Sequence, residues 1–339
     1  MRGAIGDIRN SPTDILSPED AACLRGATGD IRSVRLSTRL EGVVRLSAFE
    51  GILPAIITPM DGDGSFNEEA FRRVMEFNIG SGVHGFWIAG GTGESILLSD
   101  EENMRIASAA ADQSRGRVNN IMHVGAATTD RAARLAEHAA GAGVEAICCV
   151  PPFFYGRTDD AIAEHYRIVA AAADLPLFVY NLPQSTGVEI TTGLMRKIQE
   201  RVPQLAGLKH SSQFFPAVRN FSAMGLDCLV GNHQLMLPAL TIGATGCVDG
   251  PPIVAPEYWV EIWNAYQAGD LERAETAQDR ASGVWADLGA CGGEFHSVAK
   301  AALSERLGIE CGAARPPGGP LTKAQREKLR GTMAKLGLL

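Results

Sequence analysis

The feature that most constrains the fold is a regular alternation, between Gly51 and Gly250, of short apolar runs with longer helical patterns. The runs are continuous and rich in Val, Ile, Leu and Phe, which is typical of strands buried on both faces. Eight strands that alternate with helices over about two hundred residues predict an α/β fold of the (β/α)8, or TIM barrel, type. The predicted strands are Ile52–Pro59, Gly85–Ala89, Asn120–Gly125, Ala146–Val150, Leu177–Tyr180, Ala206–Lys209, Cys228–Gly231 and Gly246–Val248.

The segments between these runs have helical composition and spacing, and several carry end signals. Asn67, Ser99 and Thr191 are good N-caps, and Gly82 and Gly143 stand where helices should end. A doubly wound sheet is the main alternative, but it would show fewer strands per domain and a change of composition midway, which the chain lacks. The predicted helices are Asn67–Ser81, Ser99–Ser114, Thr129–Ala142, Thr158–Ala173 and Thr191–Arg201.

The chain continues in helical pattern beyond the eighth strand, with a Pro/Gly-rich break at Arg315–Pro320. That is more helix than a closed barrel needs, so we predict a helical C-terminal appendage. The barrel strands and helices should occupy residues 49–253, and the last barrel helix and the appendage residues 254–339. The helices predicted there are Ala255–Ala268, Asp270–Leu288, Glu294–Leu307 and Leu321–Leu336.

Residues 1–48 differ in character from the rest of the chain. The segment Arg2–Arg9 recurs almost unchanged as Arg25–Arg32, and two copies are too few for a solenoid. Its acidic residues argue against a transit peptide, and it lacks the apolar centre of a signal peptide. We predict a flexible N-terminal extension with a short helix near Ser37–Phe49.

Composition excludes several classes of function. A net charge of −8 and the absence of a Lys/Arg-rich run argue against a nucleic-acid surface, and no apolar run is long enough to span a bilayer. The seven cysteines form no C-x-x-C pair, and the seven histidines show no metal-binding spacing. We therefore expect a cytoplasmic protein with reduced thiols, no membrane association and no protein-ligated metal.

Polar and glycine residues cluster where the predicted strands end, while the strands themselves consist mainly of apolar residues. In a (β/α)8 barrel the carboxyl ends of the strands carry the chemistry. We therefore expect these residues to meet at one rim. They are Gly90–Ser95, Pro151–Tyr155, Tyr180–Pro183, Lys209, Gly231–His233 and Val248–Gly250.

Lys209 ends the sixth predicted strand, in the segment Leu205–Ser212. A single lysine at a strand end is usually one that reaches solvent. Burial, however, disfavours the charged form of an ammonium group, and a neutral amine attacks a carbonyl carbon. Because other chemically active residues share its rim, our hypothesis is that Lys209 forms a Schiff base with a keto acid.

Two neighbours of Lys209 on this rim suit the same chemistry. The run Gly90–Glu94 is neither a Rossmann fingerprint nor a P-loop, but such a turn can present backbone N–H groups to a carboxylate at a helix N-terminus, or it can be a plain tight turn. Thr92 could add a hydroxyl. Tyr180 stands at a strand end, where its phenol can relay protons, although a core tyrosine bonded to backbone is an alternative.

Together these motifs resemble the dihydrodipicolinate synthase / N-acetylneuraminate lyase family of pyruvate-dependent aldolases. The similarity runs from Phe49 to the C-terminus. It rests on Gly91-Thr92-Gly93-Glu94, on Tyr180-Asn181-x-Pro183 and on Gly207-x-Lys209, in this order on an eight-strand pattern.

The resemblance implies roles for individual residues. Lys209 would form the imine, Tyr180 would relay protons, and Val248 would line the pyruvate pocket. Gly91, Thr92 and Gly93 would bind the carboxylate through the threonine and the backbone amides. The resemblance also implies a homotetramer, a dimer of dimers, with no metal or organic cofactor.

The chain departs from the pattern of the synthase branch at three positions. Gly91 replaces the first of two threonines, Phe154 stands where a tyrosine crosses the dimer interface, and Ser185 replaces a carboxylate-binding arginine. The acidic residues that hold the polyol of sialic acid fall at Asn232 and His233. With Ser211 and Asp249, these positions are candidates for determining specificity.

The sequence thus predicts a Schiff-base-forming lyase that acts on pyruvate or a 2-keto-3-deoxy acid through an enamine, with a small-molecule keto acid and an aldehyde as its partners. A dehydratase or deaminase of a sugar-derived keto acid by the same imine chemistry is one alternative, and dihydrodipicolinate synthase (4-hydroxy-tetrahydrodipicolinate synthase) is another. The non-enzymatic alternative is a barrel that binds keto acids without turnover.

Overall fold

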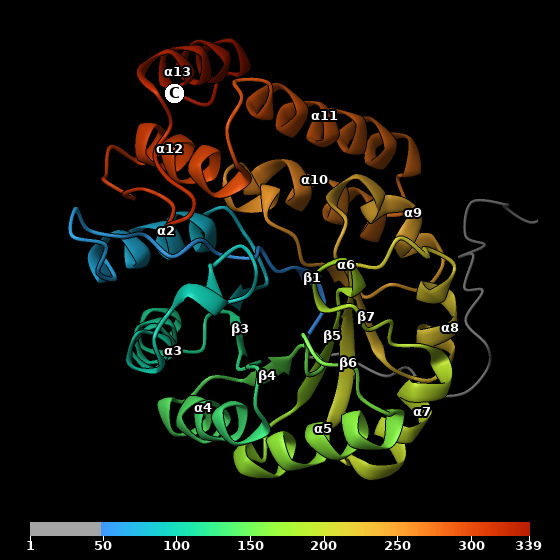
Figure 1. Cartoon of the computed structure of the whole chain (residues 1–339). Coiled ribbons are helices and arrows are strands. Elements are labelled where there is room, and N and C mark those ends of the chain that lie inside the picture. Colours follow the sequence, from blue (N-terminus) through green and yellow to red (C-terminus); the bar gives the residue numbers. More distant parts are fainter. Residues whose placement is uncertain (1–48) are drawn as a thin grey trace, which may run out of the picture. The chain divides into compact units, whose positions relative to one another are not determined.

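The computed structural model describes residues 49–339, which belong to one compact unit. The predicted extension and the helix near Ser37–Phe49 therefore lie outside the described residues, apart from Phe49 itself. Within the described part, eight parallel strands form one sheet in the order β1-β8-β7-β6-β5-β4-β3-β2 (Figure 1). The strands are β1 (Gly51–Ile52), β2 (Gly85–Ile88), β3 (Asn119–His123), β4 (Ala146–Cys149), β5 (Leu177–Asn181), β6 (Leu205–His210), β7 (Asp227–Val230) and β8 (Gly246–Cys247).

The sheet closes on itself between its first two strands. β1 pairs with β8, and beyond Ile52 the chain still bonds to β2: the amide of Trp87 donates to the carbonyl of Pro54, and the amide of Ile56 donates to the carbonyl of Trp87. The predicted (β/α)8 barrel is confirmed. The regular part of β1 is shorter than predicted, because Pro54 has no amide hydrogen and interrupts the ladder.

Helices surround the barrel, and those predicted from end signals start and stop within about two residues of the expected places, the usual uncertainty of such boundaries. Asn67 caps its helix through the amide of Ala70, and Ser99 forms a capping box with Glu102. The barrel helices are α2 (Glu68–Gly80), α3 (Asp100–Ser114), α4 (Thr129–Ala142), α5 (Asp159–Ala173), α7 (Thr192–Arg201), α8 (Ala217–Ala223), α9 (Met236–Thr241) and α10 (Pro256–Gln267).

Short helical turns were missed by the sequence patterns. They include α6 (Pro183–Thr186) and the 3-10 turns η2 (Ser95–Leu97), η3 (His233–Leu235) and η4 (Pro251–Ile253), and the barrel helices α8 and α9 were missed too. Each has seven residues or fewer, which is too short for a 3.6-residue period to show in sequence.

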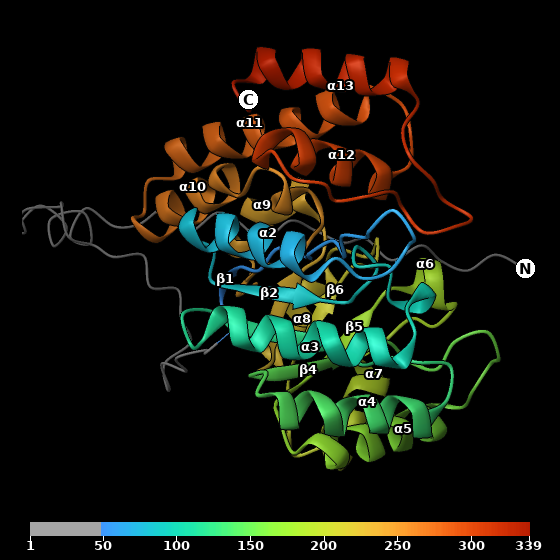
Figure 2. The same cartoon turned by 90° about the vertical axis from the view of Figure 1, so that its left-hand side faces the viewer.

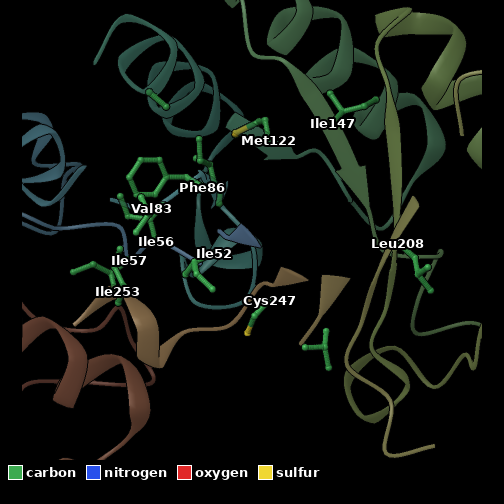
Figure 3. Packing of buried hydrophobic residues seen from close by; sticks show 14 of the residues in the cluster. Ile52, Ile56, Ile57, Val83, Phe86, Met122, Ile147, Leu208, Cys247 and Ile253 are labelled. Carbon is green, nitrogen blue, oxygen red and sulfur yellow. The ribbon is translucent and has the colours of Figure 1, made fainter. Parts of the chain in front are cut away.

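Side chains alternate between the two faces of each strand and so build two separate cores. One face packs against the helices, as Figure 3 shows for Phe86, Met122 and Leu208. The other face fills the barrel interior. The buried apolar residues of this interior cluster are Phe49, Leu53, Ala55, Trp87, Ile121, Ala146, Cys148, Val150, Phe178, Tyr180, Leu229 and Val248.

Three further helices follow α10, as the predicted appendage requires: α11 (Leu271–Gly289), α12 (Phe295–Leu307) and α13 (Lys323–Leu336). Figures 1 and 2 show them gathered beside α10 on one side of the barrel. The helix α11 packs on α10, and α12 packs on α2 and α13. The division at residue 253 stays a prediction.

A buried ion pair ties this appendage to the glycine-rich turn after β2. The ammonium of Lys300 on α12 lies 2.6 Å from Oε1 of Glu94, and both side chains are almost wholly buried. Lys300 also donates to the carbonyl of Ala313, and the amide of Arg315 donates to Oε2 of Glu94 at 2.6 Å. Burial lowers the pKa of Lys300, and the charge of Glu94 opposes that shift.

We predict that Lys300→Met destabilises the protein by about 3–5 kcal/mol, because it leaves the Glu94 carboxylate buried without its cation. Urea denaturation measures the loss. The double variant Glu94→Gln with Lys300→Met should be more stable than Lys300→Met, since it removes both charges. Lys323→Met, at an exposed pair with Glu327, should change stability by less than about 0.5 kcal/mol. An equal loss in the single and double variants would contradict this account.

Candidate active site

Lys209 projects from β6 into the barrel interior, where only 4% of its surface is exposed. Its ammonium lies 4.5 Å from the ring centre of Tyr180 and 5.4 Å from that of Trp87. No carboxylate of residues 49–339 lies within ion-pair distance of it. The two aromatic rings stabilise a cation only modestly, and no salt bridge from the described residues neutralises the buried amine. It is free to react.

Tyr180 lies directly beside Lys209, because the two residues are register partners on β5 and β6. Its ring meets Trp87 edge-on at 5.5 Å. A Cβ atom at Gly91 would lie 3.9 Å from the Tyr180 hydroxyl, so the phenol points toward the glycine-rich turn. The structure thus brings together the amine, the phenol and this turn, as their shared rim predicts.

The glycine-rich turn is shaped by close contacts that exclude side chains. A Cβ at Gly90 would lie 2.8 Å from the indole of Trp87, and one at Gly93 would lie 2.9 Å from Cα of Ala89. The amides of Gly93 and of the two residues after it bond back to carbonyls of the turn. The amides of Gly91 and Thr92 bond to no described residue, so they can donate hydrogen bonds to an anion.

The turn does not itself form the N-terminus of α3, which begins near the predicted Ser99. The turn runs into η2, and α3 begins only at Asp100, with Asp100, Glu101 and Glu102 in its first turn. Three carboxylates there disfavour an anion. Any carboxylate cradle therefore consists of the turn itself.

A glycine directly after β7 leaves space around the lysine. A Cβ at Gly231 would lie 3.1 Å from Cε of Lys209 and would collide with Oγ of Ser211. Val248 is fully buried in the interior cluster. Ser211 therefore lies beside Lys209, and Val248 lies in the same barrel interior, while their roles stay predictions.

His233 and Asp249 form a hydrogen-bonded pair at the same rim. Nδ1 of His233 lies 2.8 Å from Oδ2 of Asp249, and the backbone amide of His233 donates to the same oxygen. Burial raises the pKa of Asp249, but the bonds from His233 and the charge of Lys209 outweigh it and hold the pKa below its usual range. Asn232 is exposed, and its side chain accepts the backbone amide of Gln234 at the start of η3, so it acts as the cap of that turn.

Two predicted specificity residues are exposed to solvent. Phe154 is 85% exposed in the loop after β4, where it stacks edge-on against Tyr155. Ser185 is exposed on α6. Their part in specificity stays a prediction.

Asn181, in the Tyr180-Asn181-x-Pro183 motif, has a structural role. Its amide donates to Glu189 at 2.8 Å, and its carbonyl oxygen accepts the amide of Ile190. These bonds fasten the loop that carries α6.

The sequence analysis missed three interior residues near Lys209. Trp87, His123 and Cys148 are buried, and each faces the barrel interior. The alternation of side chains along a strand could have identified them, because a residue two positions from a known interior residue lies on the same face of the strand. The strand registers around the barrel indicate that the interior side chains form layers, each contributed by alternate strands. We infer that one layer consists of Trp87, Cys148, Lys209 and Val248. The next layer toward the carboxyl ends consists of Ala55, His123, Tyr180 and Gly231.

The surroundings of the site add three observations. A cavity of about 310 Å³ adjoins the glycine-rich turn, lined by Gly91, Glu94 and residues of the C-terminal segment such as Arg315, but not by Lys209.

Within residues 49–339, no group of three or more His, Cys, Asp or Glu side chains is placed to hold a metal ion. In the same part of the chain, none of the helices combines the length and the apolar character needed to cross a membrane.

Comparison with known proteins identifies the family of the chain. Residues 48–336 match the model of the dihydrodipicolinate synthetase family. A DapA-like lyase of Halobacterium salinarum is 36% identical over 291 residues, covering 85% of this chain and 94% of that protein. The 4-hydroxy-tetrahydrodipicolinate synthase of Methanothrix thermoacetophila is 32% identical, covering 85% of this chain and 97% of that protein.

A solved structure extends the comparison to three dimensions. A catalytic lysine mutant of the sialic acid aldolase of Ruminococcus gnavus superposes with a TM-score of 0.82 at 26% identity, covering 86% of this chain and 96% of that one. The likeness spans the whole barrel and the C-terminal helices. The chain belongs to the dihydrodipicolinate synthetase family and is a lyase of the Schiff-base-forming, class I aldolase type.

Proposed function

We propose that this protein cleaves or forms a bond of pyruvate or a 2-keto-3-deoxy acid through an imine on Lys209. The observation that carries the proposal is the convergence of an unpaired buried amine, the Tyr180 phenol and two free backbone amides within one interior site. An amine, a proton donor and an anion cradle are what imine formation with a 2-keto acid requires.

The steps follow from this placement. The carboxylate binds the amides of Gly91 and Thr92 and the Thr92 hydroxyl. The Lys209 amine attacks the keto carbon, and Tyr180 donates a proton to the departing hydroxyl, which leaves as water. The protonated imine then draws electrons from C3, so that an enamine forms and adds to, or leaves, an aldehyde.

The second substrate bears hydroxyl groups. The pair of His233 and Asp249 and the hydroxyl of Ser211 offer donors and acceptors at the open rim, on the carboxyl side of Lys209. An aldehyde derived from a sugar matches such groups. A dehydratase or deaminase of a sugar-derived keto acid uses the same imine and differs only in the group that leaves the enamine.

Dihydrodipicolinate synthase activity is the less favoured candidate. Gly91 offers no hydroxyl beside Tyr180, and Phe154 and Ser185 carry neither the phenol nor the guanidinium of that branch. Because the chain is similar in sequence to such a synthase, this activity should be tested along with the others.

We further propose a homotetramer, a dimer of dimers, located in the cytoplasm. Phe154 and Tyr155 are large exposed side chains on one loop, as a subunit contact would need. The six cysteines between residues 49 and 339 are free and buried, which suits a reducing compartment.

The direct test is to incubate the protein with pyruvate and borohydride and to locate the reduced adduct by mass spectrometry. We expect the adduct on Lys209, and we expect none in Lys209→Arg, because a guanidinium does not form the imine. An adduct on another lysine, or none, contradicts the mechanism. An adduct without turnover of any 2-keto-3-deoxy acid would favour a protein that binds keto acids without reaction.

A second prediction concerns the sugar side of the site. Asp249→Asn should leave the yield of the pyruvate adduct within about threefold but raise KM for keto-deoxy sugar acids at least about tenfold, because His233 loses the carboxylate that orients it. A panel of such acids measures KM. Asp287→Asn, on the exposed face of α11, is the matched control and should change neither quantity. An unchanged KM in Asp249→Asn would remove this pair from substrate binding.

A further inference from the structure

His123 stands at the end of β3 with its imidazole in the barrel interior and 3% of its surface exposed. Its ring meets the Tyr180 ring edge-on, with centroids 6.2 Å apart and planes at 90°. A Cβ at Gly125 would lie 2.7 Å from Nε2, so glycine there makes room for the imidazole. The side chain thus lies within the layer of the barrel that contains Tyr180, just beyond the layer of Lys209.

Both ring nitrogens of His123 are buried; the backbone of Ala89 approaches the ring closely enough to raise its pKa, and at least one nitrogen has no hydrogen-bond partner among the described residues. Two other histidines of the core are paired: His165 contacts Thr129 and Cys149, and His210 contacts Asn181 and the carbonyl of Phe214. Buried polar groups are rarely left unpaired in folded proteins, and exceptions call for an explanation. A bound reactant within the interior supplies one.

The charge state of His123 suits a proton acceptor. Burial and then the charge of Lys209 lower its pKa to about 4, against a smaller opposing effect of the Ala89 backbone, so near pH 7 the imidazole is neutral and one ring nitrogen holds a free lone pair. The groups that face it are Lys209 on β6, Tyr180 on β5 and Cys148 on β4. Burial raises the pKa of the Cys148 thiol well above its usual value, so this group is a poor acceptor.

The proposed reaction needs two proton transfers of opposite direction at this site. One group must give a proton to the departing hydroxyl at C2, and another must take a proton from C3 to form the enamine. Tyr180, at the lysine, can give the first. Nε2 of His233 at the rim is also buried without a partner among the described residues, but the Nδ1 of that ring is bonded to Asp249, whereas His123 stands beside Tyr180 in the interior with an unused basic nitrogen.

We propose that His123 is the base that removes the C3 proton from the Lys209-bound keto acid, a step that rests on the proposed function. The C3–H bond breaks and its proton binds the free imidazole nitrogen. The electron pair forms the C2=C3 bond of the enamine, and the imine π pair returns to the Lys209 nitrogen. The positive charge passes from that nitrogen to the imidazolium, so charge and atoms balance.

Electrostatics favours this direction of transfer. The charge on Lys209 is one of the causes that weaken His123 as a base. As the enamine forms, that charge is neutralised, and the imidazolium is stabilised when it appears. In the reverse reaction the imidazolium returns its proton to C3 and the imine cation is restored.

The experiment needs only pyruvate. In D2O, proton NMR follows the loss of the methyl signal as C3 exchanges its hydrogens, and borohydride trapping measures the fraction of chains that hold the adduct. The exchange rate per trapped adduct is compared between the wild type and His123→Gln, which keeps a polar side chain without a basic nitrogen. His165→Gln, at another buried histidine far from the lysine in sequence, is the matched control.

We expect His123→Gln to keep the adduct on Lys209 within about threefold while exchange per adduct falls at least about 100-fold. His165→Gln should keep the wild-type exchange per adduct. Exchange in His123→Gln within about threefold of the wild type would overturn the assignment and leave the proposed function standing.

Two other outcomes also decide the matter. If His123→Gln and His123→Asn both lose the adduct, His123 acts before the C3 step and the assignment is wrong. If the wild type itself gives no adduct, the proposed function fails and the inference fails with it.

Discussion

The structure depends on a single constraint, the alternation of side chains along strands that close into a barrel. Each strand must supply one face to the helices and the other to an interior too narrow for many large side chains. The helical face is filled by apolar residues such as Phe86 and Leu208. The interior carries Trp87, Phe178 and Tyr180 together with glycines, and this mixture leaves room for reactive groups at the carboxyl ends.

The C-terminal helices stabilise the site from outside the barrel. Lys300 on α12 pairs with Glu94, Nε2 of His296 lies 2.9 Å from the carbonyl oxygen of Gly91, and Arg315 pairs with Glu102. These contacts converge on the turn that would hold the substrate carboxylate. A turn with glycine at three of its four first positions is otherwise easily deformed, since glycine restricts the backbone least. The appendage therefore contributes to the precision of the site as well as to the core.

The site itself is not optimised for stability. Lys209 lies buried without a carboxylate, and His123 is buried with a ring nitrogen that has no partner among the described residues. Both arrangements cost free energy in the folded protein, because polar groups lose their hydration without full replacement. Elsewhere in the described barrel, buried charges such as Glu94 and Lys300 are paired. The contrast explains why the lysine and the histidine, rather than the ion pair, are the groups available to a reactant.

The sequence by itself determined the eight strands, the larger helices and the rim that holds Lys209, Tyr180 and the glycine-rich turn. These features follow from local periodicity, from caps and from the rule that barrel chemistry lies at strand ends, all of which are written in short stretches of residues. Only the tertiary structure decided that Glu94 pairs with Lys300, that His233 pairs with Asp249, that Phe154 and Ser185 are exposed, and that His123 stands beside Tyr180. Such pairings join residues far apart in the chain, and no local pattern specifies which strand or helix will face which. Strand register and the closure of the barrel set those distances.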